Sequence, residues 1–140
     1  MALTAKLQFG DNAKQQYPQE QEYMVADCRC HFSRGYNHAQ PHSDARCDQV
    51  DITVVAPNKE NMSLYDWFIS NGIQSGRIVL DAVSANNNAG ESKIIYFEDA
   101  YCYSLAEDND KDKAEQRMLK ISFVADKITI SGIEFDNILN

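Results

Sequence analysis

Most of this chain alternates apolar and polar side chains with a period of two residues. Successive side chains of a β-strand point to opposite faces, so this alternation is typical of strands that have one buried face and one exposed face. The pattern predicts an all-β, antiparallel fold. The clearest runs are residues 3–9, 24–33, 50–56 and 119–125, and Ile128 and Ile130 follow after an expected tight connection at Asp126 and Lys127.

The segment from residue 92 to residue 105 departs from simple alternation, because Glu98 and Asp99 interrupt a run of apolar and aromatic residues. An unpaired buried carboxylate is costly, so both side chains must reach solvent or find partners. We expect a strand, a kink and a second strand here, with the acidic pair marking a kink, an edge or a subunit contact. Neighbours along a strand point to opposite faces, so Glu98 and Asp99 are not expected to share a catalytic site.

Residues 63–72 break the alternation and predict one short helix. Ser63 is a suitable N-cap, and Gly72 is suited to a left-handed stop at the carboxyl end. Leu64, Trp67 and Phe68 fall on one face at helical spacing, so the helix should lie against the sheet.

Length and charge limit the remaining possibilities. The chain has 140 residues, which suits one domain spanning residues 1–140. Its net charge of −8 argues against nucleic acid and against an anionic membrane surface as partners. No stretch is long and apolar enough to insert into a membrane as a helix. The first residues lack the features of a signal peptide, so we expect synthesis and folding in the cytoplasm and export by a route that reads the folded surface.

Cysteine and histidine residues between positions 28 and 47 raise the question of a zinc site. Cys28 and Cys30 should lie on one strand face and His31 on the other, whereas structural zinc ligands usually sit on a turn. We therefore expect two small core cysteines and polar loop histidines, with the thiols reduced. The residues considered for the site are Cys28, Cys30, His31, His38, His42 and Cys47.

Other chemical motifs are incomplete. The acidic residues at 108–112 are spaced like a calcium loop, but Lys113 and Leu119 occupy the positions that require Gly and Glu. The sequence has no phosphate-binding glycine loop and no nucleophile elbow. We therefore predict that the protein is not an enzyme and has no catalytic, metal-binding or cofactor-binding residues.

Six segments, in chain order, resemble the tube protein of the type VI secretion system in its Bacteroidetes form, the TssD or Hcp-like family. They resemble the second strand, the extended loop, the helix, the strand after the helix, the most recognisable segment and the closing hairpin of that family. The segments are residues 28–33 (CRCHFS), 41–43 with Arg46, 63–68 (SLYDWF), 75–80 (SGRIVL), 97–102 (FEDAYC) and 119–130.

The resemblance implies a small antiparallel β-barrel of two sheets with one short α-helix at its side. Six copies would form a ring with a wide channel, and stacked rings would form the inner tube that a contractile sheath drives out of the cell. Effectors would travel in the channel. The implied partners are other copies of the chain and the sheath, spike and effector proteins of the machine, and the implied location is the cytoplasm followed by secretion.

The loop from residue 36 to residue 48 is the first candidate for ring-stacking contacts, and a mobile surface loop is its alternative. Exposed apolar residues on the polar strand faces are further candidates for contacts within a ring, namely Val55, Val79, Val83 and Val124. The alternative function is a monomeric β-barrel that binds a ligand or partner, which predicts a closed apolar pocket. The candidate interface residues are Tyr36, Asn37, His38, Pro41, His42, Arg46, Asp48, Glu98 and Asp99.

Overall fold

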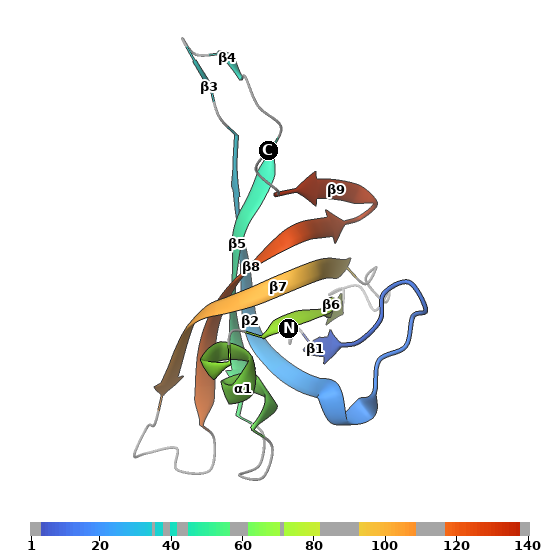
Figure 1. Cartoon of the computed structure of the whole chain (residues 1–140), viewed down its shortest axis with the longest axis vertical. Helices are drawn as coiled ribbons and strands as arrows, with labels where there is room; N and C mark the ends of the chain where they lie inside the picture. The colour runs from blue at the N-terminus through green and yellow to red at the C-terminus, as the bar shows by residue number, and fades with distance from the viewer. Residues whose placement is uncertain are drawn as a thin grey trace, which may run out of the picture.

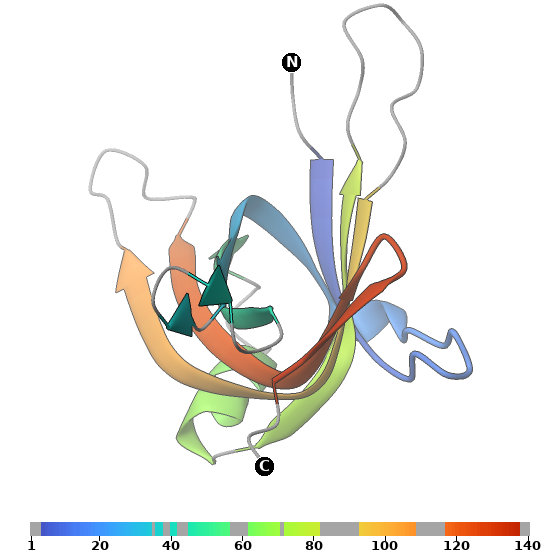
Figure 2. The ribbon, with the colours of Figure 1, turned by 90° about the horizontal axis from the view of Figure 1, so that it is seen from above.

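The computed structural model describes residues 4–34, 36–37, 40–41, 45–56, 62–70, 72–81, 93–108 and 117–137. Within these residues, six strands form a closed antiparallel barrel in the order β5-β2-β1-β6-β7-β8, and pairing of β5 with β8 closes it (Figure 1, Figure 2). The predicted antiparallel barrel is confirmed. The strands are β1 (Thr4–Phe9), β2 (Glu22–Ser33), β5 (Arg46–Val55), β6 (Ile73–Asp81), β7 (Lys93–Asp108) and β8 (Met118–Ile130).

An outer strand, β9 (Ile133–Asp136), completes the sheet by sharing one edge of β8 with β5. Residues 118–123 of β8 pair with β5, and residues 127–130 pair with β9. Asn137 lies where the two partners of β8 diverge. Its Nδ2 donates a hydrogen bond to the carbonyl oxygen of Ala125 (2.8 Å), and its Oδ1 accepts one from the backbone N–H of Cys47 (3.1 Å). This one amide therefore ties β5 to β8.

Three short elements lie outside the barrel wall. The 3₁₀ turn η1 (Gln19–Gln21) precedes β2 in the connection from β1. The two-residue strands β3 (Tyr36–Asn37) and β4 (Gln40–Pro41) pair with each other as a separate sheet. Figure 1 shows this small sheet well beyond one end of the barrel, on the continuation of β2 and β5.

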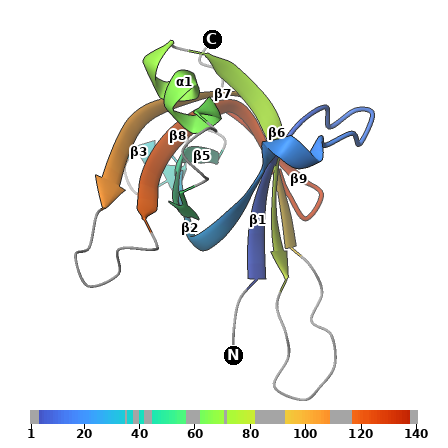
Figure 3. The same cartoon turned by 90° about the horizontal axis from the view of Figure 1, so that it is seen from below.

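The predicted helix is confirmed as α1 (Ser63–Ile69), which packs against β7 (Figure 3). Its ends differ from the prediction. Met62 rather than Ser63 is the N-cap residue and makes no side-chain capping bond, and Gly72 does not adopt a left-handed conformation. Leu64 and Trp67 are buried as expected, but Phe68 is 37% exposed. One residue rotates an α-helix by about 100°, which turns Phe68 away from the face shared by the other two.

Aromatic rings fill the centre of the barrel. Trp67 reaches in from α1 and meets the rings of Phe9 and Phe123, with centroid distances of 5.2 and 5.5 Å. Phe97 lies 5.0 Å from Phe123 and 6.2 Å from Phe9, so the four rings form one cluster. Among the described residues, no charged side chain is buried. The barrel is thus a packed core, as small barrels usually are.

A β-bulge in β2 changes which residues face this core. Val25 pairs with Val54 and Asp27 with the adjacent Thr53, so Ala26 is an extra residue. Val25 before the bulge is buried, while Met24 is 64% exposed. The predicted inward face was therefore right for Cys28 and Cys30, which pack against the core, but wrong for Met24 and Ala26.

β8 contains no turn at Asp126 and Lys127, contrary to the sequence-based expectation. The strand continues to Ile130, and the chain turns at Ser131 and Gly132, whose φ angles are 51° and 81°. Two positive φ angles in a two-residue connection are the signature of a type I′ hairpin turn. Although the strand continues, its buried positions do change phase between Ala125 and Ile128.

Candidate functional site

On β7 and on its neighbour β8, two consecutive side chains point outward, which breaks the alternation of each strand. We call these four residues the phase-shift patch, and they are Glu98, Asp99, Asp126 and Lys127. Glu98 pairs with Lys127 across the strands, and Asp99 has a φ of 53° at a bulge opposite β6. The buried residues that flank the patch are Phe97, Ala100, Ala125 and Ile128.

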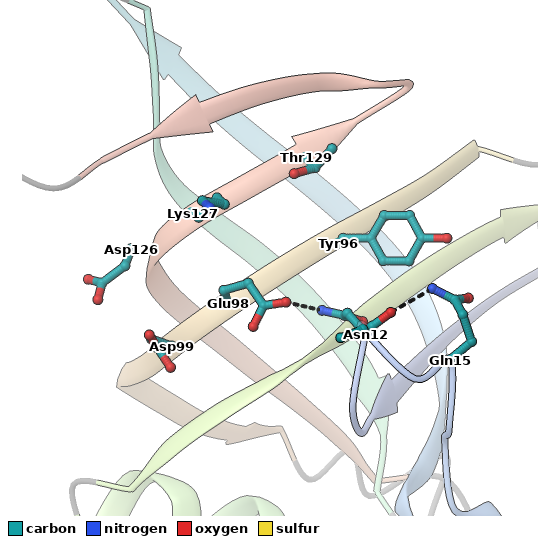
Figure 4. Close-up of a pocket in the computed structure, with 9 residues that line it drawn as sticks. Asn12, Gln15, Tyr96, Glu98, Asp99, Asp126, Lys127 and Thr129 are labelled. Atoms are coloured by element: carbon teal, nitrogen blue, oxygen red, sulfur yellow. Dashed lines mark hydrogen bonds between the residues drawn. The ribbon is translucent and has the colours of Figure 1, made fainter.

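The irregularity expected at Glu98 and Asp99 is a bulge within the single strand β7, so no separate second strand follows it, and the inference that the two side chains face opposite sides is wrong. The extra residue in β7 interrupts the alternation, so both carboxylates lie on the outer surface of the barrel. Figure 4 shows both at the rim of an open depression, with Tyr96 and Thr129 at its other end. The matching breaks in alternation at 98–99 and 126–127 are the sequence signal that would have located this surface.

Asn12, in the connection from β1 to β2, forms the other wall of the depression (Figure 4). Its Nδ2 donates to the carbonyl oxygen of Phe97 (3.1 Å) and to Oε1 of Glu98 (2.9 Å). Its Oδ1 accepts a bond of 2.6 Å from the hydroxyl of Tyr17, and its carbonyl oxygen accepts one from Gln15. These bonds fix the long polar connection to the bulged part of β7.

The same connection is held on β6 by Arg77. The guanidinium group lies 4.0 Å from the centre of the Tyr17 ring, and its Nε donates to Oε1 of Gln8 at 2.7 Å. Burial raises the pKa of the Tyr17 hydroxyl, while the positive charge of Arg77 opposes that rise. Gly10 begins the connection at a point where any Cβ would lie 2.2 Å from the carbonyl oxygen of Gln16, so a larger residue would force the backbone to move.

The depression has an excess of negative charge. It contains three carboxylates and one ammonium group, and the ammonium group of Lys127 is already paired with Glu134 at 2.9 Å. The hydrogen bond that Lys127 donates to Glu134 is the main reason that the pKa of Lys127 is raised. No three side chains within the described ranges are placed to hold a metal ion. The charge of the depression is therefore complementary to a basic group.

A polar network that sequence reasoning missed lies on the outer face of β2, β5 and β8. Asp51 is at its centre: Oδ1 accepts hydrogen bonds from Ser122 (2.6 Å) and Gln49 (2.8 Å), and Oδ2 lies 2.7 Å from Nε2 of His31. Partial burial raises the pKa of Asp51, but hydrogen bonds from Ser122, Gln49 and His31 outweigh it and leave that pKa below its ordinary value. Ser122 donates to Asp51 and not to His31, so these residues do not form a nucleophile and base pair.

The predicted stacking residues fall on separate elements from the phase-shift patch. Tyr36 and Pro41 pair with each other across β3 and β4, and Asn37 pairs with Gln40. Arg46 begins β5 opposite Ser33, and Asp48 is exposed at a second bulge between β2 and β5. His38 and His42 lie outside the described residues. The structure does not test the role of any of these residues, which stays a prediction.

Exposed apolar side chains form a stripe across three strands. Ile73 on β6 pairs with Tyr101 on β7, which pairs with Val124 on β8, and these residues are 52%, 40% and 37% exposed. We call them the β7 face. Met24 on β2, 64% exposed, marks a second apolar position. Of the other valines considered, Val55 and Val79 are half-buried, and Val83 lies outside the described residues.

A closed barrel with an outer strand and one helix is the architecture of the Hcp proteins, and several solved Hcp structures share it. Hcp1 from Flavobacterium johnsoniae is 18% identical, with a TM-score of 0.68 over 98% of this chain and 100% of that chain. The secreted protein Hcp3 from Pseudomonas aeruginosa is 17% identical, with a TM-score of 0.63 over 99% of each chain. A type VI secretion system effector from Yersinia pestis is 12% identical, with a TM-score of 0.61 over 96% of this chain and 98% of that one.

The family model of hemolysin coregulated protein Hcp (TssD) matches residues 1–138, so this chain belongs to that family. No curated protein sequence matches it significantly. The family consists of type VI secretion tube proteins, which are structural proteins and not enzymes, in agreement with the prediction. Among the described helices, none has the length and apolar character needed to span a membrane.

Proposed function

We propose that this protein is a subunit of the type VI secretion inner tube, in which six copies form a ring and the rings stack around a channel that carries effectors. It is made in the cytoplasm and leaves the cell through the secretion machine, with sheath, spike and effector proteins as its partners. Membership of the Hcp (TssD) family over residues 1–138 supports this proposal.

The observation that carries the proposal is the position of the two apolar surfaces. The β7 face is centred on β7, and Met24 projects from β2, which lies three strands away in either direction around the six-stranded barrel. Figure 3 shows β2 and β7 on opposite sides of the molecule. Two different surfaces on opposite sides allow head-to-tail contacts, and head-to-tail contacts generate closed rings when the rotation between subunits permits.

The alternative, a monomeric barrel that holds a ligand inside, has less support. Large side chains occupy the interior, and Trp67, Phe97 and Phe123 are all less than 2% exposed. A barrel filled in this way leaves no internal site for a small molecule. The channel of a tube would instead run between subunits.

The test is the mass and shape of the purified protein. Light scattering should give about six times the chain mass of 15.9 kDa, and negative-stain electron microscopy should show annular particles. Export should stop when the contractile sheath gene is deleted. A protein that stays monomeric at high concentration would contradict the ring, whereas rings without export would contradict only the role in secretion.

A further inference from the structure

One end of the β2–β5 pair extends beyond the closed barrel. We call this part the far ribbon, and it consists of residues 31–33 of β2 and residues 46–49 of β5, which lie opposite each other. β5 pairs with β8 only from Val50 onward, and β1 pairs with β2 only as far as Val25. Within the described strands, the far ribbon is therefore two strands wide, and β3 and β4 lie on its continuation (Figure 1).

A ribbon of this width has little stability of its own, since two strands usually need a third strand or another element to pack against. The far ribbon also contains a bulge. His31 lies opposite Gln49 and Phe32 lies opposite Cys47, so Asp48 is an extra residue on β5. A bulge bends its strand and increases the local twist. The direction of the far ribbon therefore depends on contacts with a third element.

β9 and the residue that follows it supply two such contacts. The ring of Phe135 lies 5.2 Å from the ring of Phe32, which is 52% exposed. Oδ1 of Asn137 accepts a hydrogen bond of 3.1 Å from the backbone N–H of Cys47, whose side chain is buried. Each strand of the far ribbon is thus held by one contact: Phe135 holds β2, and Asn137 holds β5.

Both contacts are anchored on the barrel wall. β9 pairs with residues 127–130 of β8, and Phe135 packs against the core. The backbone N–H of Asn137 donates to the carbonyl oxygen of Asp126 at 2.8 Å, and its side-chain amide donates to the carbonyl oxygen of Ala125. β9 and Asn137 therefore connect the far ribbon to the closed barrel.

We propose that Phe135 and Asn137 form a latch, which fixes the direction of the far ribbon and so positions β3 and β4 for contact with the neighbouring ring. The contact with a neighbouring ring rests on the proposed tube function, whereas the latch itself does not. Opening the latch should loosen the far ribbon and leave the barrel closed, because residues 50–55 of β5 remain paired with β8.

The order of the backbone in the folded protein tests the latch. NMR order parameters of the β5 amides should be about 0.85 in the unmodified chain, which is typical of a rigid backbone. The double variant that combines Phe32→Ala with Asn137→Ala should lower them below about 0.6 in residues 46–49 and leave residues 50–55 unchanged. A purely stabilising role would not produce this local difference, because order parameters describe the folded state alone.

Matched variants show whether the contacts themselves are responsible. Phe32→Tyr keeps the ring and should keep the order of the far ribbon, and Ile133→Ala, at a position on β9 that is 61% exposed, should do the same. Phe32→Ala alone alters a half-exposed side chain, so this variant should fold and should still lower the order of residues 31–33.

Negative-stain electron microscopy measures the consequence for assembly. The double variant should form single rings but at least about tenfold fewer stacked tubes than the unmodified chain, because a loosened contact surface must be ordered on binding. Unchanged order parameters in the double variant, or normal stacking despite a loosened far ribbon, would overturn the proposal. An unmodified chain that forms no rings would contradict the proposed tube function instead, and the order parameters would still decide whether the latch exists.

Discussion

The indole Nε1 of Trp67 donates a hydrogen bond of 3.0 Å to the carbonyl oxygen of Ala100, which joins α1 to β7 inside the core. Ala100 follows the bulge directly, at the point where β7 resumes pairing with β6, opposite Gln74. The one tryptophan of the chain thus packs against the central rings and also satisfies a buried carbonyl.

Replacing this tryptophan should separate its two roles. Trp67→Phe keeps much of the packing but leaves the Ala100 carbonyl without its donor, which should cost about 1–3 kcal/mol. Trp67→Ala also opens a cavity and should cost about 3–5 kcal/mol. Urea unfolding followed by circular dichroism measures both values. Phe68→Ala, on the exposed side of the same helix, is the control and should change stability by less than about 1 kcal/mol.

The left-handed backbone at Asp99 predicts opposite effects for two substitutions. Asp99→Gly should raise the free energy of unfolding by about 0.5–1 kcal/mol, because the relief of strain exceeds the entropy that glycine adds to the unfolded chain, whereas Asp99→Val should lower it by at least about 1 kcal/mol. Thermal unfolding of the two variants gives the comparison. Equal effects of glycine and valine would show that the conformation at this position has no energetic importance.

Asn137 should contribute to stability out of proportion to its position near the end of the described chain. Asn137→Ala removes bonds to both Cys47 and Ala125, and we expect a loss of about 1–3 kcal/mol. Hydrogen exchange should show faster exchange at the Cys47 amide. Ile133→Ala is the matched control, because Ile133 is 61% exposed on β9 and should change stability little.

Acid should weaken the network around Asp51. Its pKa is lower in the folded protein than the ordinary value of 3.8, so its contribution to stability is present above that value. The contribution is lost as the pH falls through the lower, folded-state pKa. Asp51→Asn should therefore flatten the fall in stability below about pH 4, and Ser122→Ala, which removes one hydrogen-bond donor, should flatten it partly. An unchanged acid profile in Asp51→Asn would contradict the network's role.

Head-to-tail assembly predicts which species form when two interface variants are mixed. Tyr101→Arg on the β7 face and Met24→Arg on β2 should each weaken association at least about tenfold, which is about 1.4 kcal/mol. A mixture of the two variants still has one intact copy of each surface, so it should form heterodimers but no rings. Native mass spectrometry distinguishes these species. Ile133→Arg, outside both surfaces, should assemble as the unmodified chain does.

The alternation of side chains and its interruption at residues 63–72 were sufficient to predict the antiparallel strands and the helix around Trp67, and the barrel was predicted from the resemblance to the Hcp-like family. The alternation failed where a strand contains an extra residue. The bulge at Ala26 turned Met24 and Ala26 to the outer face, contrary to the prediction, and the phase change after Ala125 was interpreted as a turn. A bulge is difficult to recognise in a sequence, because one unpaired residue hardly changes the composition of a strand.

The phase-shift patch was predicted only in part, again because of an extra residue in a strand. The acidic residues of β7 were recognised as a kink, but alternation placed them on opposite faces. Two partners of Asp51 could not be found, because His31 on β2 and Ser122 on β8 come from other strands, and the local pattern does not fix the register of those strands with β5. Long-range register of this kind is set by tertiary packing and not by local pattern.

The division of one edge of β8 between two partners has a consequence for how far the chain can be shortened. β9 supplies the backbone partners of residues 127–130, which β5 does not reach. Cutting the protein after Ile130 would expose the unpaired backbone groups of residues 127–130, with which strands of other molecules could pair. The hairpin of β8 and β9 therefore protects the protein from aggregation. Chains that end at Ile130 should precipitate before they unfold.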